Sequence, residues 1–110
     1  MIETLFRLLI AHALTDFALQ SQWMIEAKER GGVKDVFPSV HWSIVLTAHA
    51  LICGAGVWWA TGCIWVGVIE VVLHWLIDFA KCENWTNPNE DHVAHLGCRI
   101  CYLIIWCELL

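Results

Sequence analysis

Charged residues are scarce in this chain. Only 15% of its 110 residues are Asp, Glu, Lys or Arg, whereas soluble domains have about one quarter. Lys and Arg number six against eleven Asp and Glu, so the formal net charge is −5. A nucleic-acid-binding surface needs clustered basic residues, so we expect no nucleic-acid partner. The sequence also lacks a phosphate-binding glycine loop and a serine-nucleophile elbow, which excludes the enzymes built on those motifs.

Apolar residues, in contrast, make up 59% of the chain, and the mean hydropathy is +0.62. They form blocks long enough to cross a bilayer, which takes roughly 20 residues each. We therefore predict one integral membrane domain, residues 1–110, folded as an all-α four-helix transmembrane bundle. The four helices are expected at about 2–29, 39–60, 63–82 and 89–110, with Ser39 capping the second. The N-terminus has neither the basic region nor the cleavage site of a signal peptide.

Side chains able to bind metal recur four residues apart inside these apolar stretches. The pairs are His12 and Asp16, His74 and Asp78, and Asp91 and His95. Residues i and i+4 share one face of a helix, and Glu70 extends the second pair by one turn. Polar groups in a membrane are costly unless something satisfies them, and a bound metal ion is the clearest candidate.

Alternating helix directions place these pairs, together with His49 on the second helix, at the same end of the bundle. Basic residues also concentrate around the loops at this end. They are Lys28, Arg30, Lys34 and Lys81. By the positive-inside rule this end faces the cytoplasm and both termini face away from it. We therefore predict a metal site in the cytoplasmic half of the bundle, held by side chains on facing helices.

The predicted metal ligands are His12, Asp16, His49, His74, Asp78, Asp91 and His95. They offer more donors than one tetrahedral zinc ion needs, so we expect one or two divalent ions. Zinc is favoured, with manganese and iron as alternatives, because imidazole and carboxylate suit all three metals. Glu70 is the predicted catalytic general base, or else a partner that orients His74.

Each of these residues also has a purely structural interpretation. The His and Asp pairs could hydrogen-bond one another and so hold neighbouring helices together. Asp91 could be an ordinary acid in a first helical turn, favoured by the helix dipole. His41 is interpreted as a solvated residue near the interface, and His92 points away from Asp91 around the helix, so both are left out of the ligand set. Arg99 could bind a substrate anion or pair with an acid such as Glu70.

The order of these motifs resembles that of a known family. It runs His12-x3-Asp16-Phe17-x2-Gln20, then His49, then His74-x2-Ile77-Asp78-x2-Lys81, then Asp91-x3-His95. The pattern is similar to that of small integral membrane proteins of unknown function from bacteria and their phages, and it covers nearly the whole chain. It is more remotely similar to the membrane-bound metal-dependent hydrolases. His92 departs from the family, which tends to have glutamine there, and Glu70 and Cys53 are additional ligand candidates.

The resemblance implies a bacterial cytoplasmic membrane protein and, through the remote group, a metal-dependent hydrolase acting at the cytoplasmic face. We expect a phosphoester or a lipid-linked substrate. The alternative is a membrane interaction protein without enzymatic activity, for example in lysis, exclusion or anti-defence, with a metal that only stabilises the bundle. An ion conduit is disfavoured because the chain beyond Glu70 is nearly all apolar. Exposed apolar helix faces would allow a homo-oligomer.

Overall fold

The computed structural model describes residues 1–29 and 40–109, and within these ranges it contains helices and no strand. The all-α prediction is therefore confirmed. The elements are α1 (Ile2–Ala13), the π-helix η1 (Leu14–Ala18), α2 (Gln22–Ala27), α3 (Trp42–Thr61), α4 (Ile64–Cys82) and α5 (Pro88–Leu109). The predicted cap Ser39, with Arg30 and Lys34, lies outside the described residues.

The continuous first helix predicted over 2–29 is wrong. The chain leaves α1 through the wider turn of η1, and helical structure stops at Leu19. Ser21 then starts a new helix, because its hydroxyl accepts a hydrogen bond from the Met24 amide at 3.2 Å. Such a cap gives the backbone an alternative to continuing the preceding helix. The other three predicted helices are present with ends shifted by a few residues.

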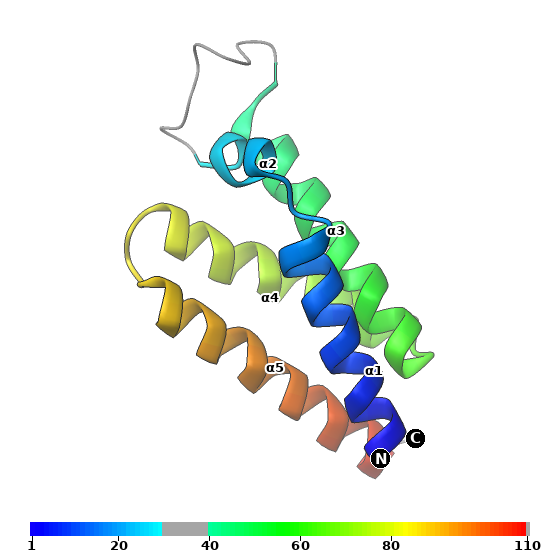
Figure 1. Cartoon of the computed structure of the whole chain (residues 1–110). Helices are drawn as coiled ribbons and strands as arrows, with labels where there is room; N and C mark the ends of the chain where they lie inside the picture. Colours follow the sequence, from blue (N-terminus) through cyan, green and yellow to red (C-terminus); the bar gives the residue numbers. More distant parts are fainter. Residues whose placement is uncertain (30–39, 110) are drawn as a thin grey trace.

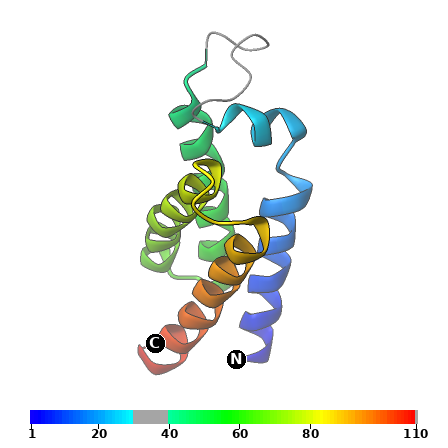
Figure 2. The ribbon, with the colours of Figure 1, turned by 90° about the vertical axis from the view of Figure 1, so that its left-hand side faces the viewer.

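The helices are arranged so that both termini and the turn between α3 and α4 lie toward one end of the molecule (Figures 1 and 2). The short helix α2 lies at the opposite end. The buried apolar cluster contains Leu8, Val57, Ala60, Val66 and Tyr102, contributed by α1, α3, α4 and α5. A turn at Gly62, whose φ of 71° is left-handed, reverses the chain between α3 and α4.

α3 and α4 cross at two glycines. A Cβ added to Gly54 would lie 2.8 Å from the carbonyl oxygen of Gly67, and one added to Gly67 would lie 2.8 Å from that of Gly54. Both positions therefore require glycine for this close backbone approach. Because His49 and Cys53 precede Gly54 on α3, the crossing also sets how near their side chains come to α4.

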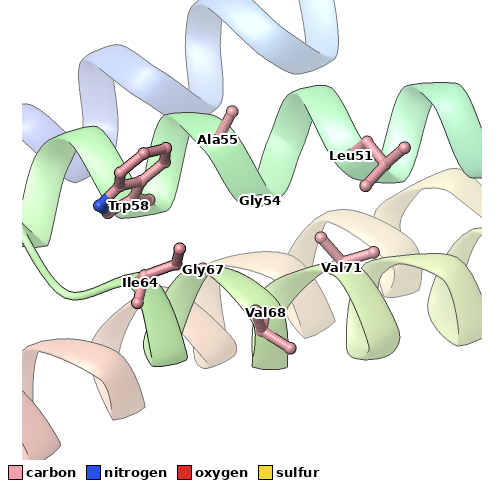
Figure 3. A pocket seen from close by; sticks show the side chains of 8 residues that line it. All are labelled: Leu51, Gly54, Ala55, Trp58, Ile64, Gly67, Val68 and Val71. Carbon is pink, nitrogen blue, oxygen red and sulfur yellow. The ribbon is translucent and has the colours of Figure 1, made fainter.

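An apolar groove of ≈ 200 Å³ lies between α3 and α4 at this crossing (Figure 3). It is lined by Leu51, Gly54, Ala55, Trp58, Ile64, Gly67, Val68 and Val71. None of the predicted metal ligands borders it, so the groove is separate from the predicted site.

Of the described helices, only α3 is both long enough and apolar enough to cross a membrane on its own, and half of it is buried inside the protein. Core helices of soluble proteins can meet the same criteria. The structure thus does not support the predicted four-span bundle or a multi-pass location. α1 has only 12 residues, and α4 carries Glu70, Asp78 and Lys81 within its 19. Two of these three charged residues, Glu70 and Asp78, belong to the predicted site, so that site helps to exclude α4 as a membrane-crossing helix by this criterion.

Gly54→Ala should lower the stability of the fold by about 1–3 kcal/mol, the usual cost of forcing extra atoms into a packed contact. The matched control is Gly97→Ala in α5, where an added Cβ would meet nothing within 4 Å. That variant should keep or slightly raise stability, because alanine is the better helix former. Thermal unfolding of the purified proteins compares them, and equal midpoints for Gly54→Ala and the parent would contradict a tight crossing.

Candidate metal centre

The predicted ligands converge on one polar interior between α1, η1, α3, α4 and α5. The described part of the chain contains three groups of side chains whose donor atoms lie within 4.8 Å of one another inside each group. They are Asp16, His49, Cys53 and His74; Glu70, His74 and His95; and Asp78, Asp91 and His95. Six of the seven predicted ligands belong to these groups, and His12 lies beside them. Their role as ligands stays a prediction.

Asp16, His49 and His74, here called the central triad, bring together side chains from η1, α3 and α4. The Nε2 atoms of His49 and His74 are 3.2 Å apart. Asp16 Oδ1 lies 3.4 Å from the first and 3.5 Å from the second. Tetrahedral zinc, with ligands about 2.0–2.1 Å from the ion, places its ligand atoms about 3.3 Å apart. The spacing of the triad therefore fits one small ion among the three atoms.

Two further side chains lie within reach of the central triad. Asp78 Oδ2 is 3.5 Å from His49 Nε2 and 3.8 Å from His74 Nε2. Cys53 Sγ is 3.4 Å from His74 Nε2 and 3.5 Å from Asp16 Oδ1. Either could provide a fourth ligand, the carboxylate suiting several divalent metals and the thiolate selecting softer ones such as zinc.

Asp16 owes its position to the π turn. In η1 the Leu19 amide donates to the Leu14 carbonyl at 2.7 Å, five residues back instead of four. Single π turns inside helices are frequent at functional sites. The second carboxylate oxygen of Asp16, Oδ2, lies 3.1 Å from His12 Nδ1, so His12 is placed behind Asp16 rather than within the triad.

His74 is fixed by a buried network on its other ring nitrogen. Glu70 Oε1 lies 3.0 Å from His74 Nδ1. Arg99 Nη1 contacts the same oxygen at 2.7 Å, and the Tyr102 hydroxyl donates to Glu70 Oε2 at 2.6 Å. A carboxylate on one imidazole nitrogen directs the lone pair of the other toward a metal. Both carboxylate oxygens of Glu70 are engaged in this network. Of its two predicted roles, the placement therefore favours orienting His74 over acting as a general base.

The third group brings α5 against α4. His95 Nε2 lies 3.3 Å from Asp91 Oδ1 and 3.8 Å from Asp78 Oδ1. Lys81 Nζ lies 3.3 Å from Asp78 Oδ1 and 3.4 Å from Asp91 Oδ2. Lys81 is therefore an ion-pair partner of two predicted ligands and not only an interfacial cation.

Lys28 is the residue that the sequence interpretation placed wrongly. It was expected among the basic residues around the loop after the first helix, but it is buried, with its ammonium 2.6 Å from Asp78 Oδ2. It also donates to the side chain of Gln20. The break before Ser21 lets α2 fold back toward α4, and only that serine cap signals it in the sequence. Tyr102 was also missed, and the single tyrosine in an apolar helix offers no comparable signal.

The two histidines left out of the ligand set lie outside the three groups. His41 caps α3, where its Nδ1 accepts a hydrogen bond from the Ser43 amide at 3.3 Å. The ring of His92 stacks on Phe17 with centroids 5.2 Å apart.

The charges of the interior also suit a cation. Asp16, Glu70, Asp78 and Asp91 face Lys28, Lys81 and Arg99, so the carboxylates outnumber the lysine and arginine side chains by one. Within the described part of the chain, several buried atoms that could bind metal have no hydrogen-bond partner. They are His49 Nδ1, Asp91 Oδ1, His95 Nδ1 and His95 Nε2. Buried polar atoms normally have partners, so these atoms could contact an ion or a water molecule.

A family model described as "Protein of unknown function (DUF3307)" matches residues 4–106, which include every residue of the three groups. The chain belongs to this family. No curated protein and no solved structure matches the chain. The match confirms the resemblance to a family of unknown function, while membrane character and likeness to hydrolases stay predictions.

His49→Asn should abolish tight metal binding, because the shorter amide does not reproduce the imidazole of the central triad. The matched control is His41→Asn, since asparagine is also a good helix cap and this histidine lies outside the site. Elemental analysis of untagged protein would show about one or two equivalents for the parent and the control. Full metal content in His49→Asn would contradict the central triad as a metal site.

Proposed function

We propose that this protein is a membrane-embedded, metal-dependent hydrolase whose divalent ion is held by the central triad, with Cys53 or Asp78 as a fourth ligand. The observation that carries the proposal is the spacing of the triad, with donor atoms from three helices 3.2–3.5 Å apart. Mixed histidine and carboxylate ligands are typical of catalytic zinc, whereas structural zinc sites are mostly rich in cysteine. Zinc is the favoured ion, with manganese and iron as alternatives.

A divalent ion bound there would polarise a substrate oxygen and lower the pKa of a water molecule to near neutrality. Residues of the chain orient the predicted metal ligands. Glu70 holds the ring of His74, and His12 contacts the free oxygen of Asp16. Lys81 is the most accessible cation of the cluster, because its side chain is 28% exposed. Its ammonium is suited to an anionic substrate, a phosphoester or a polar group on a lipid.

The distribution of apolar side chains supports a membrane location. Large apolar residues face outward, with Trp65 73%, Phe6 64% and Ile44 62% exposed, whereas Glu70 and Arg99 are each 1% exposed. This is the reverse of the usual arrangement in water. Charged residues within membrane segments normally face the interior of a bundle. We therefore propose that α4 and α5 also lie in the bilayer, their charged residues directed inward.

A membrane protein of this arrangement should have both termini on the same side. They lie near each other, away from α2 (Figure 1). In the cytoplasmic membrane of a bacterium, the positive-inside rule predicts that the α2 end, where the basic residues concentrate, faces the cytoplasm. A reporter that is active only in the cytoplasm should therefore be silent when fused after residue 110. Activity of that fusion would invert the proposed topology.

A second candidate function is non-enzymatic, with a metal that only stabilises a membrane interaction protein. Its support is burial: the side chains of His49, His74 and Asp78 are at most 2% exposed, and that of Asp16 is 10% exposed. A catalytic ion needs a position open to substrate, whereas a structural ion is enclosed by protein ligands. In this chain, access to the ion would be from the side of Asp16.

The hydrolase and the non-enzymatic membrane interaction protein differ in whether the metal-loaded protein turns over a substrate. Metal-loaded protein in detergent is assayed with bis-p-nitrophenyl phosphate and with a lipid phosphate monoester. The hydrolase should act on one of them, stop with a chelator, recover with zinc or manganese, and lose at least about 100-fold in Asp16→Asn. His41→Asn should keep full activity. If no substrate is hydrolysed while metal removal lowers the thermal midpoint, the ion is structural and the hydrolase proposal fails.

A further inference from the structure

Asp78 faces two different groups of ligands through its two carboxylate oxygens. Its Oδ2 is the oxygen near the central triad, 3.5 Å from His49 Nε2. Its Oδ1 points to α5 and lies 3.8 Å from His95 Nε2. A carboxylate with each oxygen in a separate ligand group has the geometry of a bridge between two metal ions.

The second group has ligand atoms without partners. The side chains of Asp78, Asp91 and His95 are 2%, 8% and 2% exposed, so all three are removed from solvent. Asp91 Oδ1 and His95 Nε2 lie 3.3 Å apart, yet neither makes a hydrogen bond within the described residues. The two atoms form an ion pair that lacks hydrogen-bond geometry, so each has lost its hydration for an incomplete interaction. A cation contacting both, with Asp78 Oδ1, would satisfy them.

The two groups are also close enough to act together. The rings of His74 and His95 are stacked with centroids 4.2 Å apart, so one imidazole from each group lies beside the other. Paired ions in hydrolytic centres are about 3.5–4 Å apart, and in phosphatases and nucleases the two ions stabilise the attacking and leaving oxygens of the phosphoester.

We propose that Asp78 bridges two divalent ions, one in the central triad and a second held by Asp91 and His95. This inference rests on the proposed function and narrows its substrate class to phosphoesters. The second ion is the weaker, because Lys81 contacts both of its carboxylates, Asp78 at 3.3 Å and Asp91 at 3.4 Å. Lys81 and the second ion therefore compete for the same negative charge. Beside the central triad, Lys28 contacts Asp78 Oδ2 at 2.6 Å and leaves the Asp16 carboxylate to the ion.

Manganese binding measured by titration calorimetry and by electron paramagnetic resonance tests the second position. The parent should bind two ions and show the spectrum of a coupled pair. His95→Asn should bind one ion, with an isolated-ion spectrum and an affinity within about threefold of the tighter parent site. The control His92→Asn changes a histidine on the same helix that stacks on Phe17, and it should keep both ions.

Lys81→Gln gives an independent test that removes no ligand. Losing the competing ammonium should tighten the weaker ion by about tenfold, which corresponds to about 1.4 kcal/mol of binding free energy. An unchanged weaker affinity would contradict the competition and hence the shared site.

The outcomes separate this inference from the proposed function. One ion in the parent and still one in His95→Asn would overturn the second position and leave the triad intact. No ion in the parent would overturn both. Two ions in the parent, one in His95→Asn and two in His92→Asn would support the bridge, whichever phosphoester is the substrate.

Discussion

The structure depends on burying ionised side chains among apolar helices. An isolated charge in a low-dielectric interior is very unfavourable, so each one needs an opposite charge or a hydrogen-bond donor. Asp78 meets this need through Lys28 and Lys81, and Glu70 through Arg99 and Tyr102. Removing one partner of such a pair costs about 3–5 kcal/mol, because the other charge is left alone. The helices α2, α4 and α5 are thus tied to one electrostatic network.

The convergence of these side chains could be predicted from the sequence alone. The spacing of four between His74 and Asp78 and between Asp91 and His95 places each pair on one helix face whatever the tertiary structure. Alternation of helix direction then brings the pairs to a common end. These are local and topological constraints, so they could be inferred from residue positions, and the buried stripe of Glu70, His74 and Asp78 is present in α4.

Contacts between residues far apart in the chain could not be predicted in this way. Lys28 reaches Asp78 across 50 positions, and this depends on the direction that α2 takes after the helix break. The break depends on one serine whose capping competes narrowly with helix continuation. Tyr102 meets Glu70 because of the packing of α5 on α4, which no periodicity encodes. The four-span expectation was not supported because α1 is too short to cross a membrane and α4 carries the three charged residues Glu70, Asp78 and Lys81.

The π turn sets how the segments before and after it are oriented. A π turn holds one residue more than the α-helical turn that it replaces. If Leu14–Ala18 were wound as an ordinary α-helix instead, everything after them would be rotated by about 100° relative to α1. The chain would then leave in another direction, and Lys28 would no longer lie beside Asp78. The wider turn is therefore as much a determinant of the site as the identities of His12 and Asp16.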